Sequence, residues 1–144
     1  MCIRIDSRPD HLPRLRTIVG CLAADLGMTS QETHDTNLAL TEACANAIRH
    51  GSPHGAESGV LIRIVSDHHA MIVEVTDEGG GFDVNQLSHH EPLEKPGGLG
   101  IPLMRALADE VQFLKAQKGM TVRLVKKING RVGRRRIWVR KQTH

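Results

Sequence analysis

The feature that most constrains this chain is the segment from Leu38 to Gly51, whose sequence is LALTEACANAIRHG. If this segment is a helix, Glu42 and Asn46 lie one turn apart on the same face, because residues four apart are neighbours on a helix surface. An amide oxygen can ligate Mg2+, and a carboxylate can take a proton from a nucleophile. The pair therefore suits a group-transfer site, although an isolated helix with a solvated polar face has the same appearance.

The sequence around this pair indicates how the helix begins, ends and packs. Thr29 and Glu32 form a T-x-x-E capping box, which predicts the start of the helix, and Gly51 predicts its end. A second, mostly apolar stripe runs beside the polar pair and is expected to face a core. It consists of Leu38, Thr41, Ala45 and Ile48.

The other predicted elements give the fold class. Their order is a strand, two helices, two strands, a helix and two strands. The ranges are 2–6, about 10–27, 29–51, 60–66, 70–76, 98–109, 111–116 and 120–127. This order predicts an α/β two-layer sandwich, in which three helices cover one face of a mixed, mainly antiparallel sheet.

Two glycine-rich segments follow the polar helix in the sequence. Asp77 ends a β-branched run and precedes three glycines that include Gly79 and Gly81, where the backbone can turn tightly and approach a ligand. Gly98 and Gly100 open another predicted helix, whose first amide groups are unpaired and can bind phosphate. Either segment alone is also compatible with a plain turn.

Together and in this order, the three segments resemble the motifs of the GHKL or Bergerat-fold ATPases, a family that includes the histidine kinases. The polar helix corresponds to the N box of that family, and the two glycine segments correspond to its two glycine boxes. The resemblance is strongest to the stand-alone anti-sigma factor serine kinases and covers roughly residues 3–128. It implies the histidine-kinase-like ATPase fold and an ATP-dependent serine/threonine protein kinase that uses ATP and Mg2+.

The resemblance also implies roles for individual residues. It makes Glu42 the catalytic base and Asn46 the Mg2+ ligand, while Asp77 accepts a hydrogen bond from the adenine amino group. A carboxylate in that place favours adenine, because guanine presents a carbonyl oxygen there instead of a donor. The remaining nucleotide-binding residues that it implies are Gly79, Gly81, Gly98, Gly100 and Thr121.

The partners are implied by the resemblance as well. In the anti-sigma kinases an arginine 26 residues before the N-box glutamate contacts the sigma factor, and Arg16 holds that spacing, although a solvated helix arginine is an equally good interpretation. The expected substrate is an anti-sigma factor antagonist, in partner-switching control of transcription, and the expected assembly is a homodimer. The alternative is an ATP-gated binding module without kinase activity. Glu42 favours the kinase, because a module needs no base beside the metal ligand.

Charge divides the chain into two parts. The whole sequence carries +3, but residues 129–144 hold six Arg and Lys residues and no acid, which leaves −3 on residues 1–128. We expect residues 1–128 to form the ATPase domain and 129–144 a basic tail. Because the basic charge belongs to the tail and the chain has only three aromatic residues, a nucleic-acid-binding domain is not expected.

Membrane insertion and a cysteine framework are not expected either. No apolar run approaches the ~18 residues that span a bilayer, so we expect a cytoplasmic protein with no membrane partner. The three cysteines include no C-x-x-C pair, and this pattern indicates neither a disulfide framework nor a zinc site. Cys44, inside the polar helix, is expected to be a small buried residue.

Overall fold

The computed structural model describes residues 1–80 and 100–129. Gly81, Gly98 and the basic tail from residue 130 lie outside the described residues, so their predicted roles stay predictions. The helices and strands are β1 (Cys2–Asp6), α1 (Leu12–Asp25), α2 (Ser30–His50), β2 (Gly59–Ser66), β3 (Ala70–Thr76), α3 (Gly100–Leu107), β4 (Glu110–Lys115) and β5 (Met120–Lys127). Short 3-10 turns span Pro9–His11 and Gly55–Glu57.

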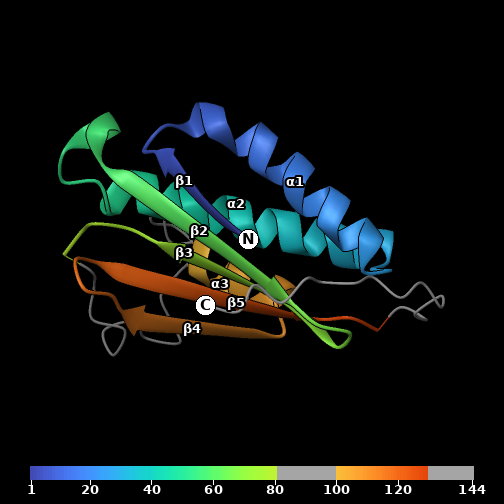
Figure 1. Ribbon diagram of the computed structural model, residues 1–144. Helices are drawn as coiled ribbons and strands as arrows, with labels where there is room; N and C mark the ends of the chain where they lie inside the picture. Colours follow the sequence, from blue (N-terminus) through green and yellow to red (C-terminus); the bar gives the residue numbers. More distant parts are fainter. Residues whose placement is uncertain (81–99, 130–144) are drawn as a thin grey trace, which may run out of the picture.

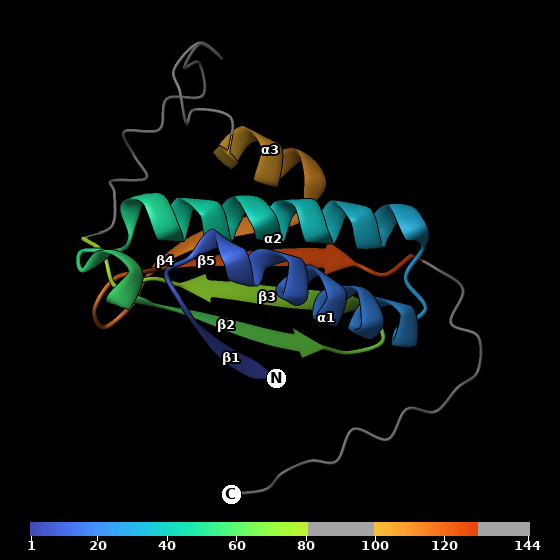
Figure 2. The same ribbon diagram turned by 90° about the horizontal axis from the view of Figure 1, so that it is seen from above.

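The described strands form one sheet in the order β1-β2-β3-β5-β4, and the helices cover one of its faces (Figure 1, Figure 2). The predicted two-layer sandwich is therefore confirmed. Each pairing between described strands is antiparallel, so the sheet is not mixed in this part of the chain. Two helices separate β1 from β2, and the chain therefore returns to the sheet where β1 stops, with Asp6 opposite Gly59.

Helix α2 lies between α1 and α3 and packs on the sheet (Figure 2). The predicted core-facing stripe of Leu38, Thr41, Ala45 and Ile48 is only partly confirmed. All four residues are partly buried, and of the apolar ones Ile48 packs against the core. Because α1, α3 and the sheet all contact α2, the buried face of this helix differs from the predicted stripe. Small side chains on the buried face let the helix approach the strands closely. The buried apolar residues of α2 are Ala39, Leu40, Ala43, Cys44 and Ala47.

The predicted capping box at the start of α2 is confirmed. The Glu32 amide donates to Thr29 Oγ1 at 3.1 Å, and the Thr29 amide donates to Glu32 Oε2 at 2.9 Å. The other oxygen of this buried carboxylate accepts from the amide of Asn129 at 2.8 Å. Glu32 thus joins the start of α2 to the backbone just beyond β5.

Helix α3 ends at Leu107, two residues before the predicted end. Asp109, just before β4, is already hydrogen-bonded to β5, since its amide donates to the Val125 carbonyl at 2.9 Å. Its carboxylate accepts from the amide of Lys127 at 2.6 Å. The register of the β4–β5 pair, which the helical pattern does not reveal, therefore sets this boundary.

The cysteines and the helices give two further findings. All three cysteines are free, and Cys2 and Cys21 are exposed. Burial raises the pKa of the Cys44 thiol to about 12, which agrees with the expected buried residue without nucleophilic character. None of the described helices is long and apolar enough to cross a membrane.

The side chain of Lys126, on β5, contacts both α2 and the end of α3. Its Nζ atom lies 3.2 Å from Asp35 Oδ2 and donates to the Leu107 carbonyl, at the end of α3, at 2.8 Å. Burial raises the pKa of Asp35, but hydrogen bonds from Gln31 and Lys126 outweigh it and hold the pKa below its ordinary value of 3.8. Because both charged side chains are at most 17% exposed, loss of one partner leaves the other poorly solvated.

We predict that Lys126→Met lowers the free energy of unfolding by about 1–3 kcal/mol, because it leaves two polar groups without their donor. Urea unfolding measures this change, and Lys127→Met at an exposed neighbouring position is the control. A lowered pKa contributes stability above the unfolded pKa and loses it as the pH falls through the folded one. The difference between wild type and Lys126→Met should therefore be constant near pH 7 and shrink below about pH 4. Equal effects of the two substitutions would contradict the prediction.

Candidate functional site

Asp77 directly follows β3, and the backbone holds one oxygen of its carboxylate. Oδ1 accepts from the amides of Gly79 at 2.9 Å and Met120 at 3.2 Å. The Asp77 amide in turn donates to the Met120 carbonyl at 3.0 Å. Oδ2 accepts no hydrogen bond from another residue that the structure describes. The carboxylate is thus fixed at one oxygen and able to accept a ligand donor at the other.

Three glycines from separate segments crowd Asp77. A Cβ atom on Gly51 would overlap the Asp77 carboxylate, and one on Gly119 would overlap the Asp77 backbone carbonyl. A Cβ atom on Gly79 would lie 2.6 Å from the Cα atom of Gly51. By contrast, a Cβ atom on Gly80 would meet nothing within 4 Å. The close approach around Asp77 therefore depends on Gly51, Gly79 and Gly119.

Of these three, only Gly79 was predicted as a site residue. In the sequence, Gly51 was predicted to end the helix. A glycine that ends a helix usually has a backbone conformation in the left-handed region. Gly27, after α1, fits that description with a φ of 74° and an open surrounding. Gly51 has a φ of −108°, so its backbone does not require glycine, and the space beside Asp77 does. The only sequence signal of this contact is that a glycine ends a helix, at Gly51, and an aspartate later ends a strand, at Asp77.

Thr121 lies on β5 beside the same group. It pairs with Thr76 across the β3–β5 ladder, and the two hydroxyl oxygens are 2.7 Å apart. Thr76 immediately precedes Asp77, and Met120, which bonds Asp77, immediately precedes Thr121. The structure thus brings together the two residues predicted to contact adenine.

The polar pair on α2 lies against the first described residue of α3. A Cβ atom on Gly100 would be 3.0 Å from Nδ2 of Asn46 and 3.4 Å from Oε2 of Glu42. Both side chains are partly buried, and neither is hydrogen-bonded to another described residue. Beside the start of α3, an amide and a carboxylate thus have no hydrogen-bond partner among residues 1–80 and 100–129.

These groups follow one another along α2. Gly51 is five residues beyond Asn46, which corresponds to about 7–8 Å along a helix axis, and Glu42 lies one turn further back. The acceptor Asp77 is therefore at one end of the row, and Asn46, Glu42 and the start of α3 are at the other. A ligand with a hydrogen-bond donor at one end and phosphates at the other has complementary groups.

The polar pair also fits a magnesium ion that is bound together with phosphates. Among the described residues, no group of three or more His, Cys, Asp or Glu side chains could hold a metal. Mg2+ keeps several waters and often takes only one or two protein oxygens beside substrate phosphates. The free amide of Asn46 can supply such an oxygen, whereas a dedicated all-protein metal centre does not fit this part of the chain.

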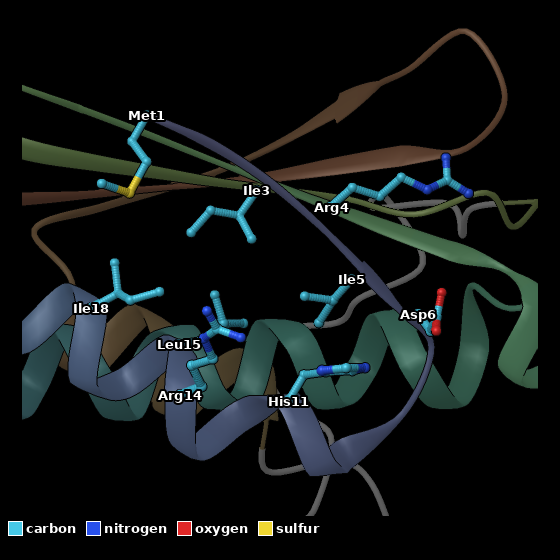
Figure 3. A pocket seen from close by; sticks show the side chains of 9 residues that line it. All are labelled: Met1, Ile3, Arg4, Ile5, Asp6, His11, Arg14, Leu15 and Ile18. Carbon is cyan, nitrogen blue, oxygen red and sulfur yellow. The ribbon is translucent and has the colours of Figure 1, made fainter.

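Arg16 is not brought to this cluster. It is exposed on α1, which lies on the opposite side of α2 from α3 (Figure 2). A groove of about 500 Å3 separates α1 from β1, with Arg14 and His11 among its lining residues, but Arg16 does not line it (Figure 3). The apolar side chains that face one another across this groove are Ile3, Ile5, Leu15 and Ile18.

Comparison with known sequences identifies the family of the chain. Residues 5–126 match the family described as Histidine kinase-like ATPase domain. The chain is 31% identical to serine-protein kinase RsbW of Bacillus subtilis (strain 168) over 137 residues, which cover 89% of this chain and 85% of that protein. The identity to serine-protein kinase RsbW of Bacillus pumilus (strain SAFR-032) is 30%, with 88% of this chain and 85% of that protein covered.

Solved structures show the same fold at lower identity. The RsbU and RsbW domains of Rv1364c from Mycobacterium tuberculosis match with a TM-score of 0.64 and 18% identity, covering 89% of this chain and 31% of that one. The histidine kinase domain from the Erythrobacter litoralis EL346 blue-light activated histidine kinase matches with a TM-score of 0.54 and 16% identity, covering 83% of this chain and 60% of that one. This chain therefore spans only about a third of the first of these structures. With the family match and the identity to the RsbW proteins, the chain belongs to the histidine kinase-like ATPase family and, within it, to the group of the RsbW serine-protein kinases.

Proposed function

We propose that the protein binds ATP and Mg2+ along α2 and transfers the γ-phosphoryl group to a serine or threonine of an anti-sigma factor antagonist. The observation that carries this proposal is the pair of Glu42 and Asn46 beside Gly100 at the start of α3, for which no described residue is a hydrogen-bond partner. The proposed context is partner-switching control of transcription. The name of the relatives, serine-protein kinase RsbW, supports the kinase activity.

The nucleotide is proposed to lie with its base at Asp77 and its phosphates near Asn46. Oδ2 of Asp77 accepts a hydrogen bond from the adenine amino group, and Thr121 lies on the neighbouring strand. Amide groups at the start of α3 donate to phosphate oxygens. The amide oxygen of Asn46 ligates Mg2+, which when bound offsets negative charge on the phosphates.

Glu42 is the proposed base for the transfer. The acceptor hydroxyl oxygen forms a bond to the γ-phosphorus while the bond to the bridging β–γ oxygen breaks, and ADP leaves. The hydroxyl proton passes to the Glu42 carboxylate. Transfer of this kind depends mainly on positioning and electrostatic stabilisation, and the close approach of Gly100 to Asn46 and Glu42 supports such positioning.

Partner binding is proposed to take place on α1, away from the nucleotide. Arg16 is exposed on α1, on the side of α2 away from α3, and a sigma factor is the proposed partner at this residue. A homodimer is proposed as the assembly. The phosphorylated antagonist dissociates, because a dianionic group repels acidic neighbours and disrupts a contact made without it.

The second candidate function is an ATP-gated binding module with little or no transfer chemistry. It needs Asp77, Asn46 and the start of α3, but it needs no base. The carboxylate of Glu42, which is close to Gly100 and has no hydrogen-bond partner in the described part of the chain, is the observation that favours the kinase.

The first prediction from this proposal concerns the recognition of adenine by Asp77. Asp77→Asn replaces a pure acceptor by an amide that can turn its NH2 group toward adenine, so ATP and ADP affinity should fall by about 1–3 kcal/mol. Isothermal titration calorimetry in the presence of Mg2+ measures this loss. Asp67→Asn, at the exposed β2–β3 turn, is the control for the same substitution. A wild-type protein without affinity for ATP would exclude both candidate functions.

The second prediction separates the two candidate functions. Glu42→Gln keeps the shape of the side chain but removes the base, so transfer to the antagonist should fall about 10²–10⁴-fold, while ATP affinity should not fall, because a negative charge near the phosphates is removed. Asn46→Ala should lose Mg2+-dependent ATP binding as well. Transfer is followed with radiolabelled ATP and the antagonist from the same organism. Undiminished transfer by Glu42→Gln would remove Glu42 as the base, and absence of transfer by wild type would favour the module.

The third prediction concerns the division into a domain of residues 1–128 and a basic tail. A chain that ends at Asn129 keeps the backbone donor to Glu32, and it should bind ATP with wild-type affinity. A chain that ends at Lys127 loses that donor and leaves one oxygen of a buried carboxylate without its partner, so it should unfold at lower urea concentration. Loss of ATP binding by the longer chain would show that the tail contributes to the site.

A further inference from the structure

We propose that Ser52 is a positioning residue that sets the preference for adenine, because it holds Gly51 against the Asp77 carboxylate. This inference rests on the proposed contact between Asp77 and the base. It extends that contact to residues at the end of α2 and on the segment after β1, for which the sequence motifs imply no role.

The hydroxyl group of Ser52 joins two segments beyond the end of α2. Its oxygen donates to the Ala47 carbonyl at 3.1 Å and is also hydrogen-bonded to the hydroxyl group of Ser7, just after β1. Ser7 is 6% exposed, and its amide donates to the Ser58 carbonyl at 2.9 Å. Ser58 is fully buried and accepts from the amide of His54 at 2.9 Å. The serines thus fix the loop after α2 from both sides.

Gly51, the residue before Ser52, is hydrogen-bonded both to α2 and to the turn that follows β3. The Gly51 amide donates to the Ala47 carbonyl at 2.9 Å, so the same carbonyl accepts from Gly51 and Ser52. The Gly51 carbonyl accepts from the amide of Glu78 at 3.2 Å. Gly51 is therefore bonded on one side to the helix and on the other to the residue after Asp77.

The Asp77 carboxylate lies directly against Gly51. The space that a Cβ atom of Gly51 would take is occupied by Cγ and Oδ2 of Asp77. Oδ1 is already fixed by two backbone amides, so the direction of Oδ2 depends on the surface behind it. A small movement of the helix end changes that surface, and the geometry of a hydrogen bond to Oδ2 changes with it.

The exposed ion pair in the same region is a weaker candidate for this role. Arg4 lies 3.5 Å from Glu78, with the two side chains 65% and 31% exposed. Solvent screens such a pair, and exposed pairs contribute little to stability. The hydrogen bonds of the partly buried Ser52 and the buried Ser7 are not screened in this way, so together with the backbone hydrogen bonds of Gly51 they hold this residue in place.

The test compares ATP with inosine triphosphate, which has a carbonyl oxygen where adenine has the amino group. Binding of both nucleotides with Mg2+ is measured by calorimetry for wild type, Ser52→Ala and Ser66→Ala, a control at an exposed serine at the far end of β2. Wild type and Ser66→Ala should prefer ATP by about tenfold or more, the usual effect of a hydrogen bond to a charged group. In Ser52→Ala this ratio should fall by about threefold or more, through weaker ATP binding, while binding of inosine triphosphate is kept.

A purely stabilising role of Ser52 would leave the ratio of the two affinities unchanged. Ser52→Thr keeps the hydroxyl group and should have the wild-type ratio of ATP affinity to inosine triphosphate affinity. Ser7→Ala should lower this ratio as Ser52→Ala does. If Ser52→Ala does not fold, Ser7→Ala and Ser52→Thr decide the question by the same ratio. Wild-type protein that binds neither nucleotide would contradict the proposed function. Wild type that prefers ATP, with an unchanged ratio in the folded Ser52→Ala or Ser7→Ala protein, would overturn this inference alone.

Discussion

The structure depends on how closely other segments approach α2. Alanines at positions 39, 43 and 47 let the helix lie near the sheet, and Gly51 and Gly100 let the Asp77 turn and α3 contact it without a side chain between them. Close packing of this kind leaves little room for adjustment, because protein interiors are nearly as dense as organic crystals. Polar groups from separate segments are therefore held beside one helix, and their spacing follows from its 1.5 Å rise per residue.

Local signals account for the parts of the fold that the sequence predicted well. The Thr29 capping box fixed the start of α2, and the β-branched runs of β2 and β3 gave a hairpin whose register agrees with the alternation of buried residues. The resemblance to the GHKL ATPases implied that Glu42, Asn46 and Gly100 belong to one site, and the structure brings these residues close together. The roles of these residues in binding and transfer stay predictions, as do those of Gly81 and Gly98, outside the described residues.

The parts that the sequence did not predict depend on contacts between distant segments. The buried face of α2 is displaced from the stripe that begins at Leu38, because α1, α3 and the sheet all contact the helix. The need for glycine at positions 51 and 119 arises from Asp77, which is 26 and 42 residues away in the chain. A glycine that avoids a clash and a glycine that adopts a left-handed φ look the same in a sequence. Only the φ of −108° at Gly51 distinguishes them.

The position of Glu42 bears on why a kinase explains this site better than a binding module. A carboxylate near the expected triphosphate repels it, since like charges a few ångströms apart interact unfavourably even with partial screening. Glu42 therefore opposes nucleotide affinity, and it has no described partner that would explain it as a structural ion pair. A group that costs ground-state affinity is favoured only where it stabilises the transition state more. Acceptance of a hydroxyl proton during attack on phosphorus meets this condition, because the carboxylate becomes neutral as charge develops on the transferred group.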